Sequence, residues 1–217
     1  MNPTQTARAG AISALVGVLL LLAMIAVGFP AQEGLARLGG PLSPRDLETI
    51  AVQGSRIAAV MALDNIFVIA YTGAFLGAAA LVWGSARWFG AAGLLFALFL
   101  AFFDLSENAV TVNVVRSVMA GSPIQPLEFT TLSWLEQVKY ASGALAVAFF
   151  AIAILLARPA SPGLRYLTAG IYLTFPLVNG LSLAIPAAKA LLFLWMLLML
   201  LGSAVLLWQS ARQAPGA

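Results

Sequence analysis

Apolar stretches long enough to cross a membrane recur along the whole chain. We expect membrane-spanning helices there, because a span needs about 20 mainly apolar residues. Six such stretches are predicted, at residues 11–29, 56–84, 90–113, 132–157, 165–184 and 187–208. The connecting segments are short, so we expect one all-α membrane domain over residues 1–217, folded as a six-transmembrane-helix bundle.

The distribution of charge predicts the orientation of this bundle. Four segments that fall on one side carry basic residues and no acid, namely Arg8, Arg87, Arg158 with Arg165, and Arg212. The opposite side mixes basic and acidic residues in two longer loops, after the first and third spans. Since cytoplasmic loops are enriched in basic residues, we expect both termini in the cytoplasm (N-in, C-in). An aromatic belt then lies at the cytoplasmic face, made of Trp83, Trp88, Tyr166 and Trp208, with Trp134 on the outer face.

Local signals place helix starts and breaks in the outer loops. Ser43, Pro44 and Asp46 have the spacing of an N-cap, a proline at the first helical position and an acid at the third, so a helix is expected to begin there. A break is expected just before it, at Gly39-Gly40-Pro41. Ser133 and Glu136 have the same spacing, which predicts a capping box at the start of the fourth span.

Composition and charge narrow the functional classes. Hydrophobic residues make up 62% of the chain and charged residues 9%, so we expect a multi-pass protein of a bacterial inner (cytoplasmic) membrane without a separate soluble domain. The net charge of +3 comes from dispersed basic residues, which indicates topology and not a nucleic-acid partner. The chain has no cysteine and no histidine. We therefore expect no disulfide, no metal and no cofactor, and partners that are lipid or membrane-soluble small molecules.

Acidic residues inside two of the apolar stretches are the most informative chemical feature. The second span carries Asp64 and Asn65, and the third carries Asp104, Glu107 and Asn108. A carboxylate in hydrocarbon is costly and therefore marks a candidate functional site. If the second span enters from the outer side near residue 56, Asp64 lies about 8 residues in, roughly 12 Å below the boundary at 1.5 Å per residue.

Polar residues of other spans are expected at the same depth below the outer boundary as Asp64, so we expect them to contact these acids. The third span runs in the opposite direction, so its acids also fall in the outer third. Lys139 in the fourth span and Asn179 in the fifth lie in the same layer. Pro176 removes a backbone donor from the fifth span, which predicts a kink one turn before Asn179.

Helical phase supports the same meeting. Asp104, Glu107, Asn108 and Thr111 follow an i, i+3, i+4, i+7 pattern and share one face. In the second span, Asp64 shares a helix face with Tyr71. In the fourth span, Lys139 shares a helix face with Glu136. We therefore expect four candidate catalytic residues, Asp64, Asp104, Glu107 and Lys139, and five candidate substrate-binding residues, Asn65, Tyr71, Asn108, Tyr140 and Asn179.

Structural interpretations stand beside these functional ones. Lys139 in a buried ion pair would fix helix packing. The three asparagines would act as interhelical hydrogen-bonding groups, and the tyrosines as packing residues with a satisfied hydroxyl. Three acids against one lysine, however, leave excess negative charge, which requires a protonated carboxyl or a bound cation.

Three hypotheses follow from different functional classes. In the first, the pocket opens to the outer leaflet and binds, and converts by acid–base chemistry, a lipid-like or isoprenoid molecule. In the second, the acids bind a proton or cation in a transporter or channel, where a homo-oligomer would complete the pathway. In the third, the protein is a subunit or assembly factor of a larger membrane complex, and the polar layer holds its helices together.

Overall fold

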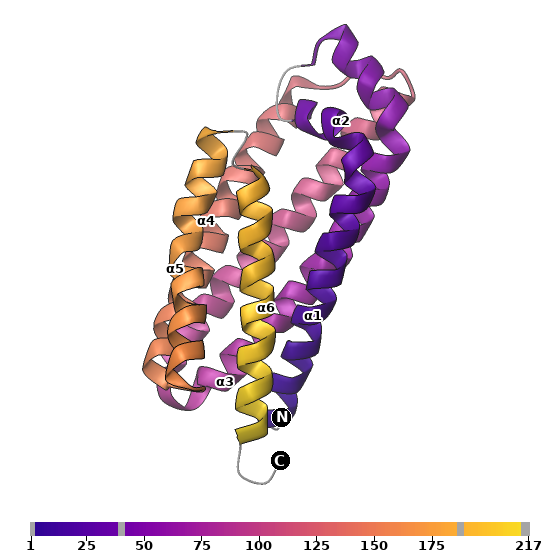
Figure 1. Ribbon diagram of the computed structural model, residues 1–217. Helices are drawn as coiled ribbons and strands as arrows, with labels where there is room; N and C mark the ends of the chain where they lie inside the picture. The colour runs from indigo at the N-terminus through magenta and orange to yellow at the C-terminus, as the bar shows by residue number, and fades with distance from the viewer. Residues whose placement is uncertain (1–2, 39–41, 186–188, 214–217) are drawn as a thin grey trace.

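The fold is all-helical over the residues that the computed structural model describes, which are 3–38, 42–185 and 189–213. Figure 1 shows its long helices side by side, with α1 beginning and α6 ending at the same end of the bundle. The elements in chain order are α1 (Pro3–Gly28), the 3₁₀ turn η1 (Phe29–Ala31), α2 (Gln32–Arg37), α3 (Pro44–Met119), α4 (Pro126–Ala157), α5 (Pro162–Ala184) and α6 (Lys189–Gln213).

Among the described residues, four helical segments are long and apolar enough to cross a membrane. They are Thr4–Arg37, Pro44–Met119, Pro126–Ala157 and Ala190–Gln213. The large apolar side chains on the outside of the bundle have no protein covering them; Leu19 is 67% exposed and Ile69 is 70% exposed. These features are compatible with a membrane-integral protein, whose outer surface is solvated by lipid.

Helix α3 folds back on itself at Ala86, the residue with non-helical backbone angles (φ −139°, ψ 40°). Its two arms, 44–85 and 87–119, run antiparallel. Near the open ends of the arms, a Cβ added at Gly54 would lie 2.5 Å from Met119 Sδ. The predicted spans 56–84 and 90–113 lie in these two arms, so the turn brings their acids to the same depth.

Small residues allow close contacts between the long helices. A Cβ added at Gly10 in α1 would lie 2.7 Å from the Cα of Gly77 in the first arm of α3. A Cβ added at Gly93 would lie 2.9 Å from the ring of Phe150 in α4.

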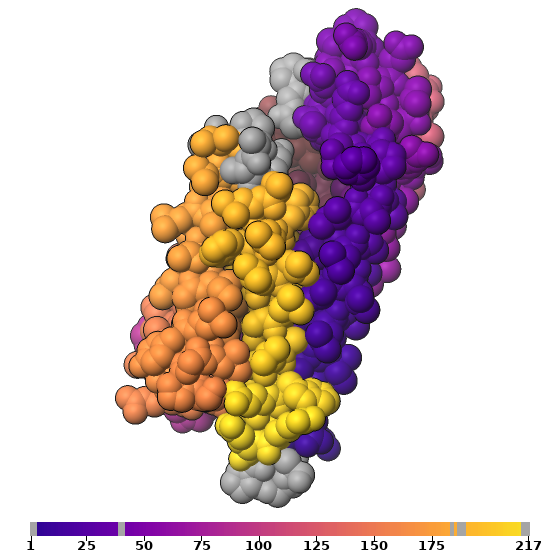
Figure 2. Space-filling model, viewed as in Figure 1, coloured from indigo at the N-terminus to yellow at the C-terminus, as the bar shows by residue number. Residues whose placement is uncertain are grey.

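The main core lies near the α3 turn, and its side chains are fully buried at Phe150, Ile154 and Leu207. Figures 1 and 2 show α6 packed between α1 and α5 on the face of the bundle that is turned towards the viewer.

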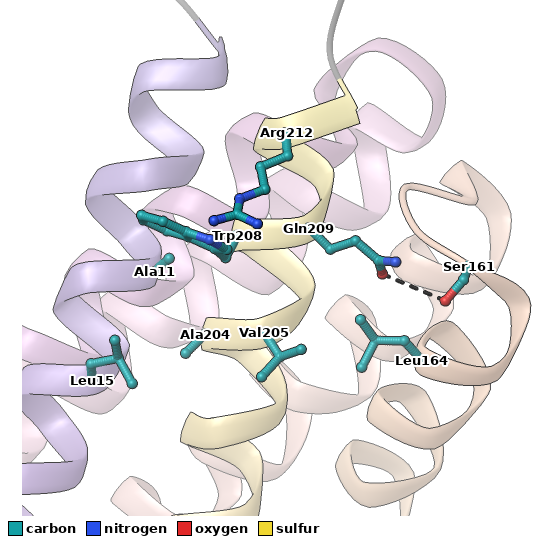
Figure 3. A pocket seen from close by; sticks show the side chains of 9 residues that line it. All are labelled: Ala11, Leu15, Ser161, Leu164, Ala204, Val205, Trp208, Gln209 and Arg212. Atoms are coloured by element: carbon teal, nitrogen blue, oxygen red, sulfur yellow. Dashed lines mark hydrogen bonds between the residues drawn. The ribbon is translucent and has the colours of Figure 1, made fainter. Parts of the chain in front are cut away.

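Aromatic and arginine side chains gather at the end of the bundle where α6 finishes. Trp83, Trp88, Tyr166 and Trp208 are all exposed. The Arg212 guanidinium lies 5.4 Å from the ring centroid of Trp208. An open hollow of about 630 Å³ lies beside this pair, between α1, α5 and α6 (Figure 3). Arg212 is its only charged lining residue among those the structure describes.

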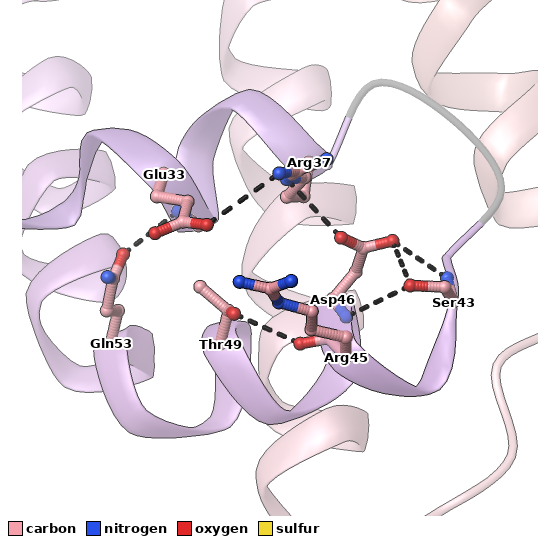
Figure 4. A network of polar contacts seen from close by, with 8 residues as sticks. Glu33, Arg37, Ser43, Arg45, Asp46, Thr49 and Gln53 are labelled. Carbon is pink, nitrogen blue, oxygen red and sulfur yellow. Dashed lines mark hydrogen bonds and ion pairs between the residues drawn. The ribbon is translucent and has the colours of Figure 1, made fainter.

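The start of α3 agrees with the sequence. Ser43 is the N-cap, its backbone N–H donates to Asp46 Oδ2 at 2.9 Å, and the Asp46 N–H donates to Ser43 Oγ at 3.3 Å. Arg37 at the end of α2 reaches Asp46 Oδ1 at 3.3 Å, which ties α2 to the start of α3 (Figure 4). The predicted helix start at Ser43 is therefore confirmed, and the two hydrogen bonds form a capping box. The predicted break at residues 39–41 lies outside the described residues.

The predicted start of the fourth span is wrong. Helix α4 begins at Pro126, and its capping box is formed by Gln125 and Glu128; the Gln125 N–H donates to Glu128 Oε2 at 3.1 Å. The capping pattern therefore occurs earlier in the chain, with a proline at the first helical position, so Ser133 and Glu136 lie inside the helix. Glu136 is thus free for another role.

The proline of the fifth span does not end its helix, and the predicted kink stays a prediction. Pro176 lies inside α5, and the helix continues to Ala184. Neighbouring groups hold α5 in this region: Trp195 Nε1 in α6 donates to the Ile171 carbonyl and to Thr174 Oγ1, each at 3.1 Å. A proline is tolerated inside an apolar helix when neighbouring helices support its backbone.

Candidate functional site

A cavity of about 640 Å³ lies between the helices at the end of the bundle away from the α3 turn. One part of its wall is polar, with Asp64, Tyr71, Asp104, Glu107, Asn108, Thr111, Ser133, Glu136, Lys139 and Tyr140. The remainder is mainly apolar, with Met24, Phe67, Phe75, Leu100, Phe175, Leu192, Met196, Met199 and Leu200 among its lining residues. The cavity therefore joins a charged region to an apolar one, as an amphiphile does.

An asparagine joins the two arms of α3 at the polar wall. Asn108 Nδ2 donates to Asp64 Oδ2 at 2.7 Å and to Asn65 Oδ1 at 3.0 Å. Asn108 is 3% exposed, whereas Asp64 is half-buried and Asn65 is exposed. Because the arms are antiparallel, residues 44 positions apart in the chain meet here. The amide satisfies part of the hydrogen-bonding capacity of Asp64 without neutralising its charge.

A lysine from α4 joins the other two acids. Lys139 Nζ lies 3.2 Å from Asp104 Oδ1 and forms a second ion pair with Glu107. Tyr71 in the first arm donates its hydroxyl proton to Asp104 Oδ2 at 3.1 Å. Asp104 is 7% exposed. Burial of these charges is compensated by mutual pairing and hydrogen bonding, which is the condition for charges inside a low-dielectric interior.

The charges around the cavity do not balance. Among the residues that the structure describes, Lys139 is the only basic side chain in the wall, whereas four acids line it: Asp64, Asp104, Glu107 and Glu136. The lysine pairs with Asp104 and Glu107. With all carboxyls ionised, the wall carries a formal charge of −3, from four acids and one lysine.

The remaining predicted site residues lie in different places. Tyr140 lines the cavity, with its ring centroid 5.3 Å from Lys139 Nζ. Asn65 contacts the cluster through Asn108 but faces outward. Asn179 is 5% exposed and does not line the cavity; within the described part of the chain its Oδ1 has no hydrogen-bond partner. The structure thus brings eight of the nine predicted residues together and leaves Asn179 apart.

Sequence reasoning missed two kinds of lining residue. Glu136 was interpreted as a helix cap, although it lies three residues before Lys139 and therefore on the same face of α4. The second kind is the apolar part of the wall, which includes Met24 and Met196. Apolar positions of this type are common to every face of a membrane helix, so no signal in the sequence distinguishes them.

The composition of the wall limits its chemistry. No group of three or more acidic side chains converges on a metal-binding position among the residues that the structure describes. The carboxylates can accept protons or hydrogen bonds, and Lys139 and Tyr71 can donate them. The arrangement can therefore bind a polar headgroup and exchange protons with it.

The cavity has a side that faces away from the bundle centre. Leu35, Ala36 and Leu38 of the α2 region line it, as do Leu192 and Phe193 of α6. Figure 2 shows a recess on the surface between these two segments. The cavity is therefore open to the surface at this recess.

Comparisons of the chain with protein-family models, with curated proteins and with solved structures found no match.

Proposed function

We propose that this protein is a multi-pass protein of a bacterial inner membrane and that its cavity binds a small lipid-like or isoprenoid molecule near the outer leaflet. The observation that carries the proposal is the union, in one cavity, of the Asp104–Lys139–Glu107 cluster with a long apolar wall. Ligand sites are typically apolar pockets of roughly 300–1,000 Å³ with a few convergent polar groups. The cavity of about 640 Å³ has this form.

The proposal includes six spans with both termini in the cytoplasm. The fold-back at Ala86 supports it, because each arm of α3 is long enough to cross a bilayer. Helix α5 has 23 residues, about 35 Å at 1.5 Å per residue, against a hydrocarbon core of about 30 Å. In this orientation the α3 turn and the exposed Trp88 and Trp208 lie at the cytoplasmic interface, and the cavity lies in the outer half.

Acid–base conversion of the ligand is the enzymatic form of this proposal. Asp64, Asp104 or Glu107 would exchange a proton with the ligand, and Lys139 would stabilise negative charge that develops on it. No step in this scheme requires a metal or a cofactor. The nitrogen of Lys139 is held by two carboxylates, so its position is set before the ligand binds.

Transport of a cation is a weaker interpretation. Between the cavity and the α3 turn, most of the described interior side chains are apolar, including the fully buried Phe150, Ile154 and Leu207. The buried polar residues described on α5 and α6 in this direction are Arg165, Thr168, Ser203 and Ser210, and none of them is an acid that would hold a cation.

Neutral isosteres distinguish a binding site from a structural cluster. Asp104→Asn and Glu107→Gln each remove one charge, keep the side-chain shape and leave Lys139 one carboxylate partner. We expect both variants to stay folded and to lose the lipid-like molecules that co-purify with the wild-type protein, as measured by native mass spectrometry. The matched control is Glu48→Gln, which removes one exposed charge outside the cavity.

The opposite results favour the structural interpretation. If the two neutral variants retain the same molecules and unfold at the same or a higher temperature, the charges serve packing alone, since removing them relieves the cost of burial. Tryptophan fluorescence reports unfolding here, because the chain has five tryptophans.

A further inference from the structure

The pairing of charges leaves part of the cavity wall without a cation. Lys139 Nζ is engaged by Asp104 at 3.2 Å and by Glu107. Asp64 accepts one hydrogen bond from the neutral amide of Asn108, and Glu136 has no ion pair; among the described residues neither has a basic partner. Two carboxylates therefore line the cavity without an ion-pair partner among the described residues.

A threonine in the same wall also has a hydroxyl without a partner among the described residues. Thr111 is 7% exposed, lines the cavity and makes no hydrogen bond to any residue that the structure describes. Other threonines of α3 bond to the carbonyl one turn back, as Thr72 does to Val68 O at 2.7 Å. The Thr111 hydroxyl opens on the cavity and its hydrogen-bonding capacity is unused among the described residues, so it can bond to a polar group that enters the cavity.

We propose that the molecule bound in this cavity is a cationic amphiphile, with a protonated amine headgroup that binds at Asp64, Glu136 and Thr111. This inference rests on the proposed function and names its ligand class. A primary ammonium group has three N–H donors and no acceptor. The two unpaired carboxylates and the threonine hydroxyl supply three acceptors. An anionic headgroup would instead meet a wall with excess negative charge, which like-charge repulsion disfavours.

The apolar part of the cavity suits a single flexible chain. Four methionines line it, Met24, Met61, Met196 and Met199, from α1, the first arm of α3 and α6. Methionine side chains are flexible and polarisable, so they adapt to chains of different shape. The recess between α2 and α6 leads from the surface to this part of the wall (Figure 2).

Four probes with the same 18-carbon chain test the headgroup: octadecylamine, octadecyltrimethylammonium, octadecanol and octadecyl phosphate. The full-length protein in phosphatidylcholine nanodiscs is titrated with each probe, and bound probe is counted by native mass spectrometry against empty nanodiscs. We expect one octadecylamine per protein, bound at least tenfold more tightly than octadecyl phosphate. Asp64→Asn should weaken the binding of octadecylamine about tenfold and leave the binding of octadecanol unchanged. Glu48→Gln should change the binding of neither probe.

A second variant keeps the test independent of the stability of Asp64→Asn. Thr111→Val replaces the hydroxyl by a methyl group of similar size. This variant should weaken the binding of octadecylamine, because that headgroup has N–H donors. The binding of octadecyltrimethylammonium should stay unchanged, because that headgroup has none. Equal weakening of both probes, or of neither, overturns the assigned role of the hydroxyl.

The outcomes separate this inference from the proposed function. If the wild-type protein retains none of the four probes above the empty-nanodisc level, the proposed amphiphile site is wrong. If octadecanol or octadecyl phosphate binds as tightly as octadecylamine, the site stands and the cationic headgroup is overturned.

Discussion

Asn108 donates both protons of its side-chain amide to the first arm of α3, one to Asp64 Oδ2 at 2.7 Å and one to Asn65 Oδ1 at 3.0 Å. A single buried residue therefore holds the arms together at the depth of the cavity. An aspartate at this position would offer no donor and would repel Asp64. The amide thus sets the spacing of the arms and the position of a cavity carboxylate at the same time.

Replacement of this amide should destabilise the fold. Asn108→Ala leaves the oxygens of Asp64 and Asn65 without their donor, and we expect a loss of about 1–3 kcal/mol in the free energy of unfolding. Thermal and denaturant unfolding, followed by tryptophan fluorescence in detergent, measures this loss. The control is Asn113→Ala, because Asn113 donates to Glu128 at 2.5 Å in an exposed hydrogen bond between α3 and α4. A loss no larger than that of the control would show that the Asn108 bridge does not stabilise the bundle.

Removal of the cavity lysine should lower the free energy of unfolding more than removal of the Asn108 amide does. Lys139→Met keeps the length of the side chain but leaves Asp104 and Glu107 without their cation, and breaking a buried ion pair typically costs about 3–5 kcal/mol. We expect a loss of this size in the free energy of unfolding at neutral pH. Arg37→Met is the matched control, since the Arg37 side chain is 51% exposed and ion pairs of an exposed cation contribute about 0–1 kcal/mol.

A compensating variant tests the cause of that loss. If the loss arises from uncompensated charge, then Lys139→Met combined with Asp104→Asn and Glu107→Gln should recover most of the stability. No recovery would mean that the aliphatic part of Lys139, and not its charge, maintains the packing of α4 against α3.

The meeting of the acids with Lys139 could be predicted because helix geometry is regular. A rise of 1.5 Å per residue gives the depth of Asp64 and Lys139, and the 3.6-residue turn places Asp104, Glu107 and Asn108 on one face. The contacts of Lys139 with Asp104 and Glu107 confirm that prediction. The roles of these residues in binding or catalysis stay predictions.

Rotation of a helix about its axis was not predictable from depth. Asn179 is buried outside the cavity, whereas Ser182, three residues later in α5, lines the wall. The orientation of α5 depends on contacts with α6, such as the hydrogen bond of Tyr172 with Ser203 at 2.5 Å. A single sequence does not show which residues of two helices will pack together.

The start of α4 was misplaced because the capping pattern occurs twice in residues 125–136, and the sequence does not show which of the two begins the helix.

The crossing of α1 and α3 should tolerate no side chain at its closest point. Gly10→Ala places a Cβ 2.7 Å from the Cα of Gly77, so the helices must separate. Overpacking of this type costs about 1–3 kcal/mol, and we expect a lower unfolding temperature. Gly170→Ala in α5 is the control, because a Cβ there meets nothing within 4 Å and alanine favours helix over glycine. Equal unfolding temperatures for the two variants would show that the crossing has room to relax.

The start of α3 should depend on pH through Asp46, which lies outside the predicted spans. Hydrogen bonds from the side chain and backbone of Ser43, together with the nearby Arg37 guanidinium, hold the pKa of Asp46 below its ordinary value of 3.8. A carboxyl whose pKa is lowered by folding stabilises the folded state above pH 3.8, and that stabilisation is lost as the pH falls through the lower folded pKa.

Hydrogen exchange at the start of α3 measures this dependence. Exchange of amides 46–50, normalised to the intrinsic rate at each pH, should be slower in the wild-type protein than in Asp46→Asn at pH 6. We expect this difference to shrink as the pH falls below about 4, because protonation of Asp46 removes the charge that the variant already lacks. Ser43→Ala should reproduce the faster exchange, since it removes the hydroxyl partner of Asp46 (Figure 4). A difference that stays constant or grows between pH 6 and pH 3 would contradict a lowered pKa, and would assign the cap to the shape of the side chain and not to its charge.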